Sequence, residues 1–104
     1  MADTFVALLR VHLFLPDSHS LKAKRAQLNR VKAHLRERVG ASVSEVEGQD
    51  TWQRATLAVA LTAGSESGAQ SRVDDATRVI DRLFPDGTRV ERRIVSWADM
   101  EPIG

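Results

Sequence analysis

The fold is decided by residues 42–63, SVSEVEGQDTWQRATLAVALTA, in the middle of the chain. Two strands are expected here, at 42–47 and 52–63, on either side of a short polar turn. Apolar residues alternate with small or polar ones along the second strand, so one side of this hairpin should be buried and the other open. The expected inward residues are Leu57, Val59 and Leu61.

A strand and a helix precede the hairpin. Residues 5–15 alternate in the manner of a strand, and residues 21–38 carry an apolar stripe at helical spacing. Ser18 or Ser20 is expected to cap this helix, because a serine oxygen can accept a hydrogen bond from an amide of the first turn. Gly40 is expected to end it, because glycine readily adopts the left-handed conformation that is common just past a helix.

A helix and a strand follow the hairpin. Residues 64–68, GSESG, are expected to form a loop, and the second helix should then run to Pro85 with Asp74 and Asp75 near its start. A last strand is expected at 88–97. The order β-α-β-β-α-β predicts an α+β, ferredoxin-like fold, in which two helices cover one face of a four-stranded antiparallel sheet.

Length and composition indicate one ordinary domain. The chain has 104 residues, of which 42% are hydrophobic and 28% charged, and these values are typical of a soluble globular protein. The domain should span 1–97, with a flexible tail at 98–104. The absence of cysteine excludes disulfides and cysteine-bound metal clusters. The most apolar run is too short to cross a bilayer, so we expect a cytoplasmic protein with no membrane partner.

The first helix is strongly basic. It holds seven of the 15 lysines and arginines but one of the 14 acids, so it carries a net charge of +6 in a chain whose total is +1. A basic ridge, within an arc of about 80° beside the apolar stripe, is expected from the helical spacing of five residues. They are Lys22, Arg25, Asn29, Lys32 and Arg36.

The basic ridge has two readings. It suits an anionic partner such as RNA, because phosphates or carboxylates are attracted to clustered cations near a helix N-terminus. It could equally be a solvated face that pairs with acids of the second helix, namely Asp74, Asp75 and Asp81. Lys24 lies near the apolar stripe itself, and its ammonium group is expected to extend outward to water.

Polar residues also surround a tryptophan at the turn of the hairpin. We call this group the hairpin cluster; it consists of Gln49, Asp50, Trp52, Gln53 and Arg54. Such residues can recognise a ligand, but they can also stabilise a tight turn while the tryptophan covers the sheet, and the structural role is favoured. Glu45 and Asp50 could act as an acid–base pair, but no substrate pocket is implied and catalysis is not expected there.

The sheet face away from the helices is the third candidate surface. It should present Leu8, Phe14, Ala58 and Ala60, and it is expected to be too apolar to be left bare. Self-association is therefore its expected use. Stacking of nucleic-acid bases is a weaker alternative, because residues 52–63 lack the glycine-aromatic signature of the RNA-recognition motif.

No set of residues predicts catalysis, a cofactor or a metal. The three histidines, His12, His19 and His34, have neither metal-ligand spacing nor acidic partners at fixed offsets. The chain also lacks a glycine-rich phosphate loop and a nucleophile motif. A non-enzymatic protein is expected.

Two segments resemble the motifs of a known family. Residues 20–25, SLKAKR, are similar to an S-L-K-x-K-R motif that opens the family's first helix, and residues 45–55, EVEGQDTWQRA, are similar to its E-V-x-x-Q-D-x-W-Q-R-A hairpin. From Phe5 to Val95, the chain thus resembles the small bacterial YlxP-like family of unknown function. The resemblance implies a ferredoxin-like fold. It also implies a role at the ribosome or on RNA, since the family's genes commonly lie among those for translation initiation and ribosome maturation. It supplies no catalytic residues.

The leading hypothesis is a protein that binds ribosomal RNA, a ribosomal subunit or an assembly intermediate through the first helix. Trp52 and Arg54 are expected to help position it. The expected phosphate contacts are Lys22, Lys24, Arg25, Lys32 and Arg36. The alternative is a homo-oligomeric scaffold or small-ligand module that uses the open sheet face.

Overall fold

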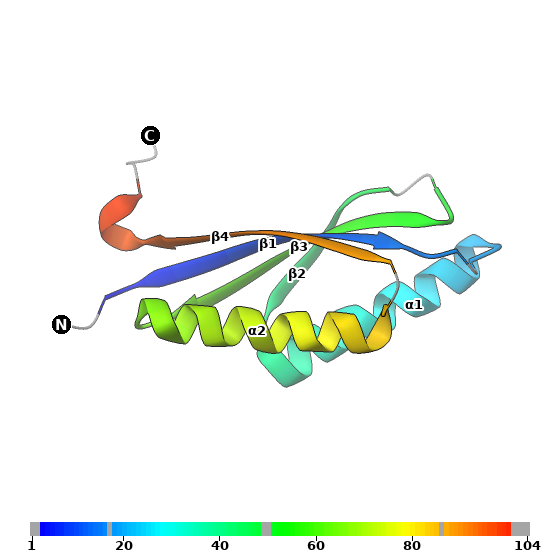
Figure 1. Ribbon diagram of the computed structural model, residues 1–104. Helices are drawn as coiled ribbons and strands as arrows, with labels where there is room; N and C mark the ends of the chain where they lie inside the picture. Colours follow the sequence, from blue (N-terminus) through cyan, green and yellow to red (C-terminus); the bar gives the residue numbers. More distant parts are fainter. Residues whose placement is uncertain (1–2, 17, 49–50, 86, 101–104) are drawn as a thin grey trace.

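The computed structural model describes residues 3–16, 18–48, 51–85 and 87–100, and it confirms the ferredoxin-like fold (Figure 1). In chain order the elements are β1 (Phe5–Phe14), α1 (Leu21–His34), the π-helical turn η1 (Leu35–Val39), β2 (Ser42–Glu47), β3 (Arg54–Ala63), α2 (Glu66–Leu83), β4 (Thr88–Ser96) and the 3-10 turn η2 (Trp97–Asp99). The strands form one antiparallel sheet in the order β2-β3-β1-β4.

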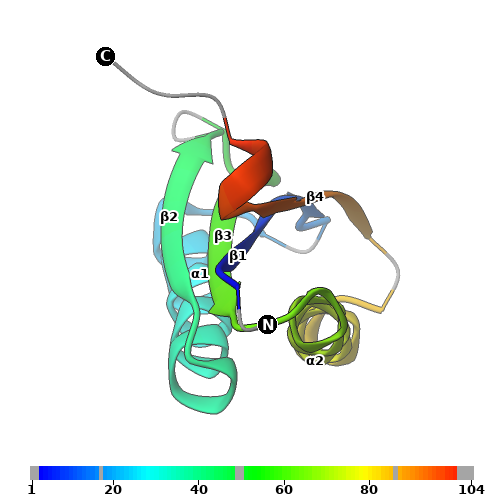
Figure 2. The same ribbon diagram turned by 90° about the vertical axis from the view of Figure 1, so that its left-hand side faces the viewer.

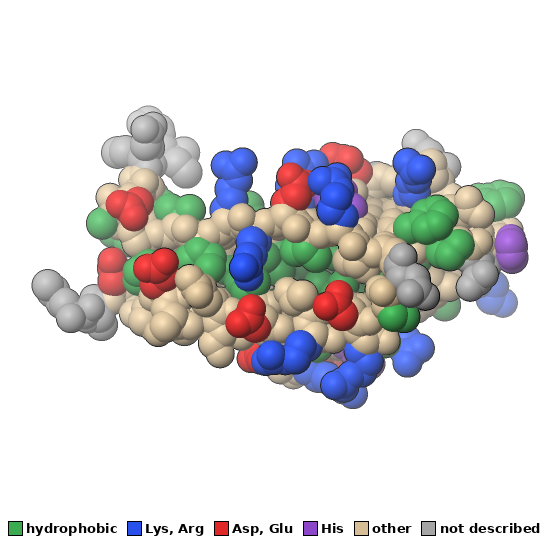
Figure 3. All heavy atoms as spheres, in the orientation of Figure 1, with side chains coloured by type: hydrophobic (Ala, Val, Ile, Leu, Met, Phe, Trp, Pro, Cys, Tyr) green, Lys and Arg blue, Asp and Glu red, His purple; other side chains and the backbone are tan. Residues whose placement is uncertain are grey.

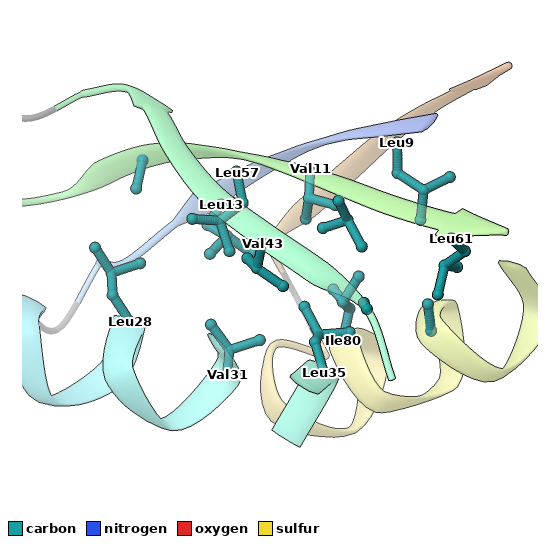
Figure 4. Close-up of a cluster of buried hydrophobic side chains, with 14 of the residues drawn as sticks. Leu9, Val11, Leu13, Leu28, Val31, Leu35, Val43, Leu57, Leu61 and Ile80 are labelled. Carbon is teal, nitrogen blue, oxygen red and sulfur yellow. The ribbon is translucent and has the colours of Figure 1, made fainter. Parts of the chain in front are cut away.

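Both helices cover the same face of the sheet. In Figure 2, α1 lies beneath the side formed by β2 and β3, and α2 lies beneath the side formed by β1 and β4. The core fills the space between the two layers (Figure 4). The predicted inward residues Leu57, Val59 and Leu61 are buried there, as are Leu28 and Ile80 of the helices. Each such side chain contributes about 1.5–3 kcal/mol by leaving water.

The ends of α1 follow the sequence signals. Ser20 is the N-cap: its backbone is extended, and its Oγ accepts a hydrogen bond from the amide of Ala23 at 3.1 Å. At the other end the helix widens into η1, and Gly40 ends it in the left-handed conformation with φ of 72°. The amide of Gly40 donates to the carbonyl of Arg36 at 3.1 Å, which satisfies one of the free carbonyls at the helix end.

The second helix begins earlier than predicted. It starts at Glu66, inside the expected loop 64–68, so Asp74 and Asp75 lie in its middle rather than near its start. Ser65 is the N-cap, and its Oγ accepts a hydrogen bond from the amide of Gly68 at 3.0 Å. The glycines and serines suggested a loop, but here they form a helix cap.

Two strand ends also differ from the prediction. β3 begins at Arg54, so Trp52 and Gln53 precede it, and β4 ends at Ser96. The chain then enters η2, whose first turn is closed by the Ser96 hydroxyl, which accepts a hydrogen bond from the amide of Asp99 at 3.2 Å. Of the tail predicted at 98–104, residues 101–104 lie outside the described residues.

Candidate nucleic-acid interface

The basic ridge faces the β2 edge of the sheet. Arg25 forms a bidentate salt bridge with Glu45 of β2, with nitrogen–oxygen distances of 2.8 and 2.9 Å. Further along the helix, the guanidinium of Arg36 donates to the carbonyl of Val43 at 2.9 Å. The contacts follow from the position of α1 beneath the β2 side of the sheet (Figure 2).

The expected pairing of the ridge with acids of α2 is wrong. Among the described residues, no acid of α2 forms a salt bridge with α1. Asp74 instead lies 3.8 Å from Arg92 of β4, and Asp75 pairs with Arg78 on its own helix. The acids of α2 thus leave the charge of α1 uncompensated.

Lys24 does not extend to water as predicted. Its side chain is 0% exposed, and its Nζ donates to the carbonyls of Gly48 and Thr51 in the turn between β2 and β3. Burial of a lysine is costly unless its ammonium group is hydrogen-bonded, and these two carbonyls supply that compensation. Lys24 is therefore a structural residue, and it is removed from the expected set of phosphate contacts.

Like Lys24, the Arg25–Glu45 salt bridge has a structural role. The Glu45 side chain is largely buried, while that of Arg25 is partly exposed. Hydrogen bonds from the Arg25 guanidinium lower the pKa of Glu45 from its ordinary value, and its burial opposes this effect in part. The same contact raises the pKa of Arg25. Glu45 offsets the charge of Arg25 and accepts hydrogen bonds from both of its terminal nitrogens. Arg25 is therefore a weaker phosphate ligand than the sequence suggested.

These contacts join the two sequence motifs. Lys24 and Arg25 belong to the SLKAKR segment, and their partners Glu45, Gly48 and Thr51 belong to the hairpin segment. We call these five residues the helix–hairpin anchor. A glycine is required at position 48, since φ is 88° and an added Cβ would lie 2.6 Å from the carbonyl oxygen of Arg54. The motifs therefore specify how the hairpin turn docks on α1.

The hairpin cluster does not form one surface. Gln49 and Asp50 lie outside the described residues. Trp52 is 53% exposed, and the Gln53 side chain donates to the carbonyl of Pro16 at 3.4 Å. Arg54 is opposite Phe14 in the sheet and lies on the open face, away from the helices. It therefore cannot share one flat contact surface with the ridge of α1.

Five cations of α1 and η1 stay at the molecular surface. Lys22, Arg30, Arg36 and Arg38 are exposed, and Lys32 is half-buried. None of the five forms a salt bridge within the described parts of the chain. Figure 3 shows Lys and Arg side chains on the helix side of the molecule and on the open side of the sheet. The helix therefore keeps a net positive surface after its structural cations are set aside.

The open face is not one apolar surface. Leu8 and Phe14 are 46% and 44% exposed, but they are six residues apart on β1, which is about 20 Å along a strand. Arg10 and His12 lie between them and point to the same face. Ala58 and Ala60 are half-buried beside Arg10 and Leu8. The expectation that this face is too apolar to be bare is corrected by these charges.

A charged network crosses this face, and no sequence pattern indicated it. His12 Nε2 lies 2.6 Å from Glu91 Oε1 of β4, and its Nδ1 lies 3.2 Å from the hydroxyl of Thr56 on β3. Arg10 lies 3.2 Å from Glu47 and 3.9 Å from Glu91. A hydrogen bond from His12, assisted by the nearby arginines, lowers the pKa of Glu91.

These partners come from different strands, so only the strand register brings them together. His12 had appeared to lack an acidic partner, because Glu91 is 79 positions away. Strand alternation had placed His12 on the outward side, but no local pattern indicated which residue of β4 would be next to it.

The family of this chain follows from sequence comparison. Residues 6–94 match the family described as "Protein of unknown function (DUF503)". The chain belongs to this family. Its similarity to a relative supports the assignment: a protein of Bacillus subtilis (strain 168), named "Uncharacterized protein YlxP", is 35% identical over 78 residues, which cover 75% of this chain and 80% of that protein. The YlxP-like resemblance of the two motifs is thus confirmed.

The fold of this DUF503 member is similar to that of a solved structure. The de novo designed protein Foldit4 superimposes with a TM-score of 0.58 at 15% identity, covering 89% of this chain and 97% of that one. A second designed protein, LFR1 1, is described as having a ferredoxin fold; it gives a TM-score of 0.45 at 15% identity and covers 86% of this chain and 83% of its own. At these identities the likeness concerns the fold alone.

Two other kinds of site are absent from the described ranges of this DUF503 member. No helix in the described ranges is both long and apolar enough to span a bilayer. Within the same ranges, no three His, Asp or Glu side chains are grouped so that they could hold a metal ion. His19 is exposed and His34 is half-buried.

Proposed function

We propose that this protein binds RNA non-enzymatically, on a ribosomal subunit or an assembly intermediate, through the exposed cations of α1 and η1. The observation that carries the proposal is the set of five surface cations that no described acid pairs with. They are Lys22, Arg30, Lys32, Arg36 and Arg38. Three of them, Lys22, Lys32 and Arg36, belong to the basic ridge on one side of the helix. Such a row of cations attracts a polyanion, because each phosphate contact releases condensed counterions.

The ridge has a length that suits several phosphates. Lys22 and Arg36 are 14 positions apart, which corresponds to about 21 Å along a helix. Trp52 is exposed and directly follows Thr51, whose carbonyl binds Lys24 in the first turns of α1, so its backbone lies at the same end of the helix as Lys22. A tryptophan beside a row of cations can stack on an unpaired base while the cations contact the backbone. Contacts of this kind supply affinity without reading sequence.

The test is co-sedimentation of the protein with ribosomal subunits at low and moderate salt. The variant Lys22→Gln/Lys32→Gln/Arg36→Gln removes three ridge cations and should lose most of the association. The control Arg78→Gln/Arg82→Gln/Arg92→Gln removes the same charge from α2 and β4 and should associate like the parent. Equal loss in both variants, or association that is insensitive to salt, would contradict binding through the ridge.

Homo-oligomerisation through the open sheet face is a second proposal. It is favoured by the exposure of Leu8, whose neighbour on β3 is Ala60. Sedimentation velocity at micromolar concentration tests it. Under this proposal Leu8→Glu and Phe14→Glu should yield monomers that keep the helical content of the parent. A parent that already sediments as a monomer would exclude it.

A further inference from the structure

The open face is hollowed between the β2–β3 hairpin and the start of β4. The hollow has a volume of about 630 Å³ and is lined mainly by polar and charged side chains. In this lining His12 is partly buried and Thr56 is buried. Phe14 is the last residue of β1, Arg54 is the first residue of β3, and Arg89 lies on β4. A hollow of this size is in the range of small-molecule sites.

The charge left available in the hollow is positive. Arg54 forms no side-chain hydrogen bond or salt bridge with any residue that the structure describes. The Arg89 side chain is 71% exposed, and its contact with Glu91 is loose, at 3.9 Å. Among the described residues, the two acids nearby have closer partners, because Glu47 is 3.2 Å from Arg10 and Glu91 is 2.6 Å from His12. An anion would therefore meet two arginines whose charges are not closely paired.

The two arginines come from the strands on either side of β1, which carries an aromatic ring at its end. Arg54 on β3 is opposite Phe14 of β1, whereas Arg89 on β4 is opposite His12. Their backbones are therefore two strand spacings apart across the sheet and two residues apart along it, or about 12 Å. Phe14 is directly opposite Arg54, and its ring is 44% exposed. Two long guanidinium side chains can converge on one phosphate over such a span.

The backbone beneath this ring is held firmly. The amide of Phe14 donates to the carbonyl of Gly87 at 2.8 Å, and the amide of Leu15 donates to the carbonyl of Gln53 at 2.7 Å. Gly87 permits this approach, since an added Cβ would lie 2.9 Å from the carbonyl oxygen of Phe14. The ring is thus presented by a strand that is fixed on both sides, which reduces the entropy lost on binding.

We infer that this hollow binds one nucleotide, with its base stacked on Phe14 and its phosphate held between Arg54 and Arg89. A flat aromatic group joined to a phosphate matches an exposed ring beside one arginine, with a second arginine across β1, better than an inorganic anion does. Free nucleoside monophosphates and single nucleotides within an RNA strand share this chemistry. The second source rests on the proposed function, in which RNA lies on the protein.

The test is an NMR titration of backbone amides with AMP, UMP, inorganic phosphate and a short single-stranded RNA. Nucleotides should shift the amides of 12–14, 54–56 and 87–89. Arg54→Gln and Arg89→Gln should each weaken binding about tenfold, and Phe14→Leu should weaken nucleotides but not phosphate. Arg93→Gln, which removes an exposed cation from the same face outside the hollow, is the matched control and should bind like the parent.

The outcomes separate the sources and the two proposals. Binding of RNA but not of mononucleotides, with the same shifts and the same loss in the variants, identifies the strand as the source. Inorganic phosphate that binds as tightly as AMP, or no shift at these amides with any ligand, overturns the inference. RNA binding that is lost in Lys22→Gln/Lys32→Gln/Arg36→Gln but unchanged in Arg54→Gln, Arg89→Gln and Phe14→Leu overturns the inference and leaves the proposed function standing. The reverse pattern supports the inference and contradicts the ridge as the RNA surface.

Discussion

The basic ridge of α1 and the hollow of the open sheet face both gather cations, but they are assembled differently. The ridge comes from one helix, and its charge is evident from the local sequence. The hollow takes Arg54 from β3 and Arg89 from β4, so it exists only once the sheet has formed. Lys24, Arg25 and Arg36 of the basic helical segment have protein partners, whereas the Arg54 side chain has none among the described residues. A local count of cations therefore does not measure the charge available to a ligand.

The largest loss of stability is expected from a substitution of Lys24, the buried cation of α1. Lys24→Met keeps the length of the side chain but leaves the carbonyls of Gly48 and Thr51 without their donor, which should lower the free energy of unfolding by about 3 kcal/mol. Lys22→Met removes the same charge from the exposed side of α1 and should change it by less than about 0.5 kcal/mol. Urea denaturation measures both. Equal losses would mean that the two lysines do not differ in the way described.

A smaller loss is expected from the turn that Lys24 binds. Gly48→Ala must adopt a positive φ and approach the carbonyl of Arg54, so it should cost about 2 kcal/mol of unfolding free energy. Gly64→Ala is the matched control, because the nearest atom to its added Cβ is 3.9 Å away, in the carbonyl of Asp3. If thermal unfolding found both variants to be as stable as the parent, the turn would not need a glycine.

The Arg25–Glu45 salt bridge should make stability dependent on acid. The folded-state pKa of Glu45 lies below its ordinary value, so its contribution is full above that ordinary value and is lost as the pH falls through the lowered folded value. Glu45→Gln should therefore flatten the decline of unfolding free energy between neutral and strongly acidic pH.

A coupled pair provides the control. Arg25→Gln should remove the same part of the pH dependence, and the double variant should remove little more. Full additivity of the two single variants, measured by denaturation at several pH values, would show that Arg25 is not the cause of the lowered pKa of Glu45.

The smallest effect concerns single cations of the ridge. If Lys22 contacts one phosphate, Lys22→Gln should lower the slope of log affinity against log salt by about 0.7 for single-stranded RNA. Arg82→Gln, on the exposed side of α2, should leave the slope unchanged. Fluorescence anisotropy with a labelled oligonucleotide measures both, and an equal change in the two variants would indicate a diffuse effect of net charge.

Features that depend on local chemistry could be predicted from the sequence. The alternation of Leu57, Val59 and Leu61 specified the buried side of β3, and Ser20 and Gly40 marked the ends of the first helical segment. The start of α2 was misplaced, because Ser65 and Gly68 are typical of both loops and helix caps. Only the contact between the serine oxygen and the glycine amide distinguishes the two.

Features that depend on distant partners could not be predicted. Lys24 was expected at the surface because helical spacing alone cannot show that the turn after β2 would come within reach of its ammonium group. His12 was given no acidic partner because Glu91 joins it only through the register of β1 and β4. The sequence therefore predicted the ridge but included too many cations as available to a ligand, and it did not predict the hollow as a site.

The helix–hairpin anchor has a consequence for local unfolding. The first turns of α1 carry cations at the positive end of the helix dipole, which by itself favours fraying. The hairpin carbonyls hold Lys24, so α1 cannot fray without releasing the turn, and the turn cannot open without breaking the same two hydrogen bonds. The beginning of α1 and the facing ends of β2 and β3 therefore form one cooperative opening unit, in which amide hydrogens of both segments exchange with solvent together.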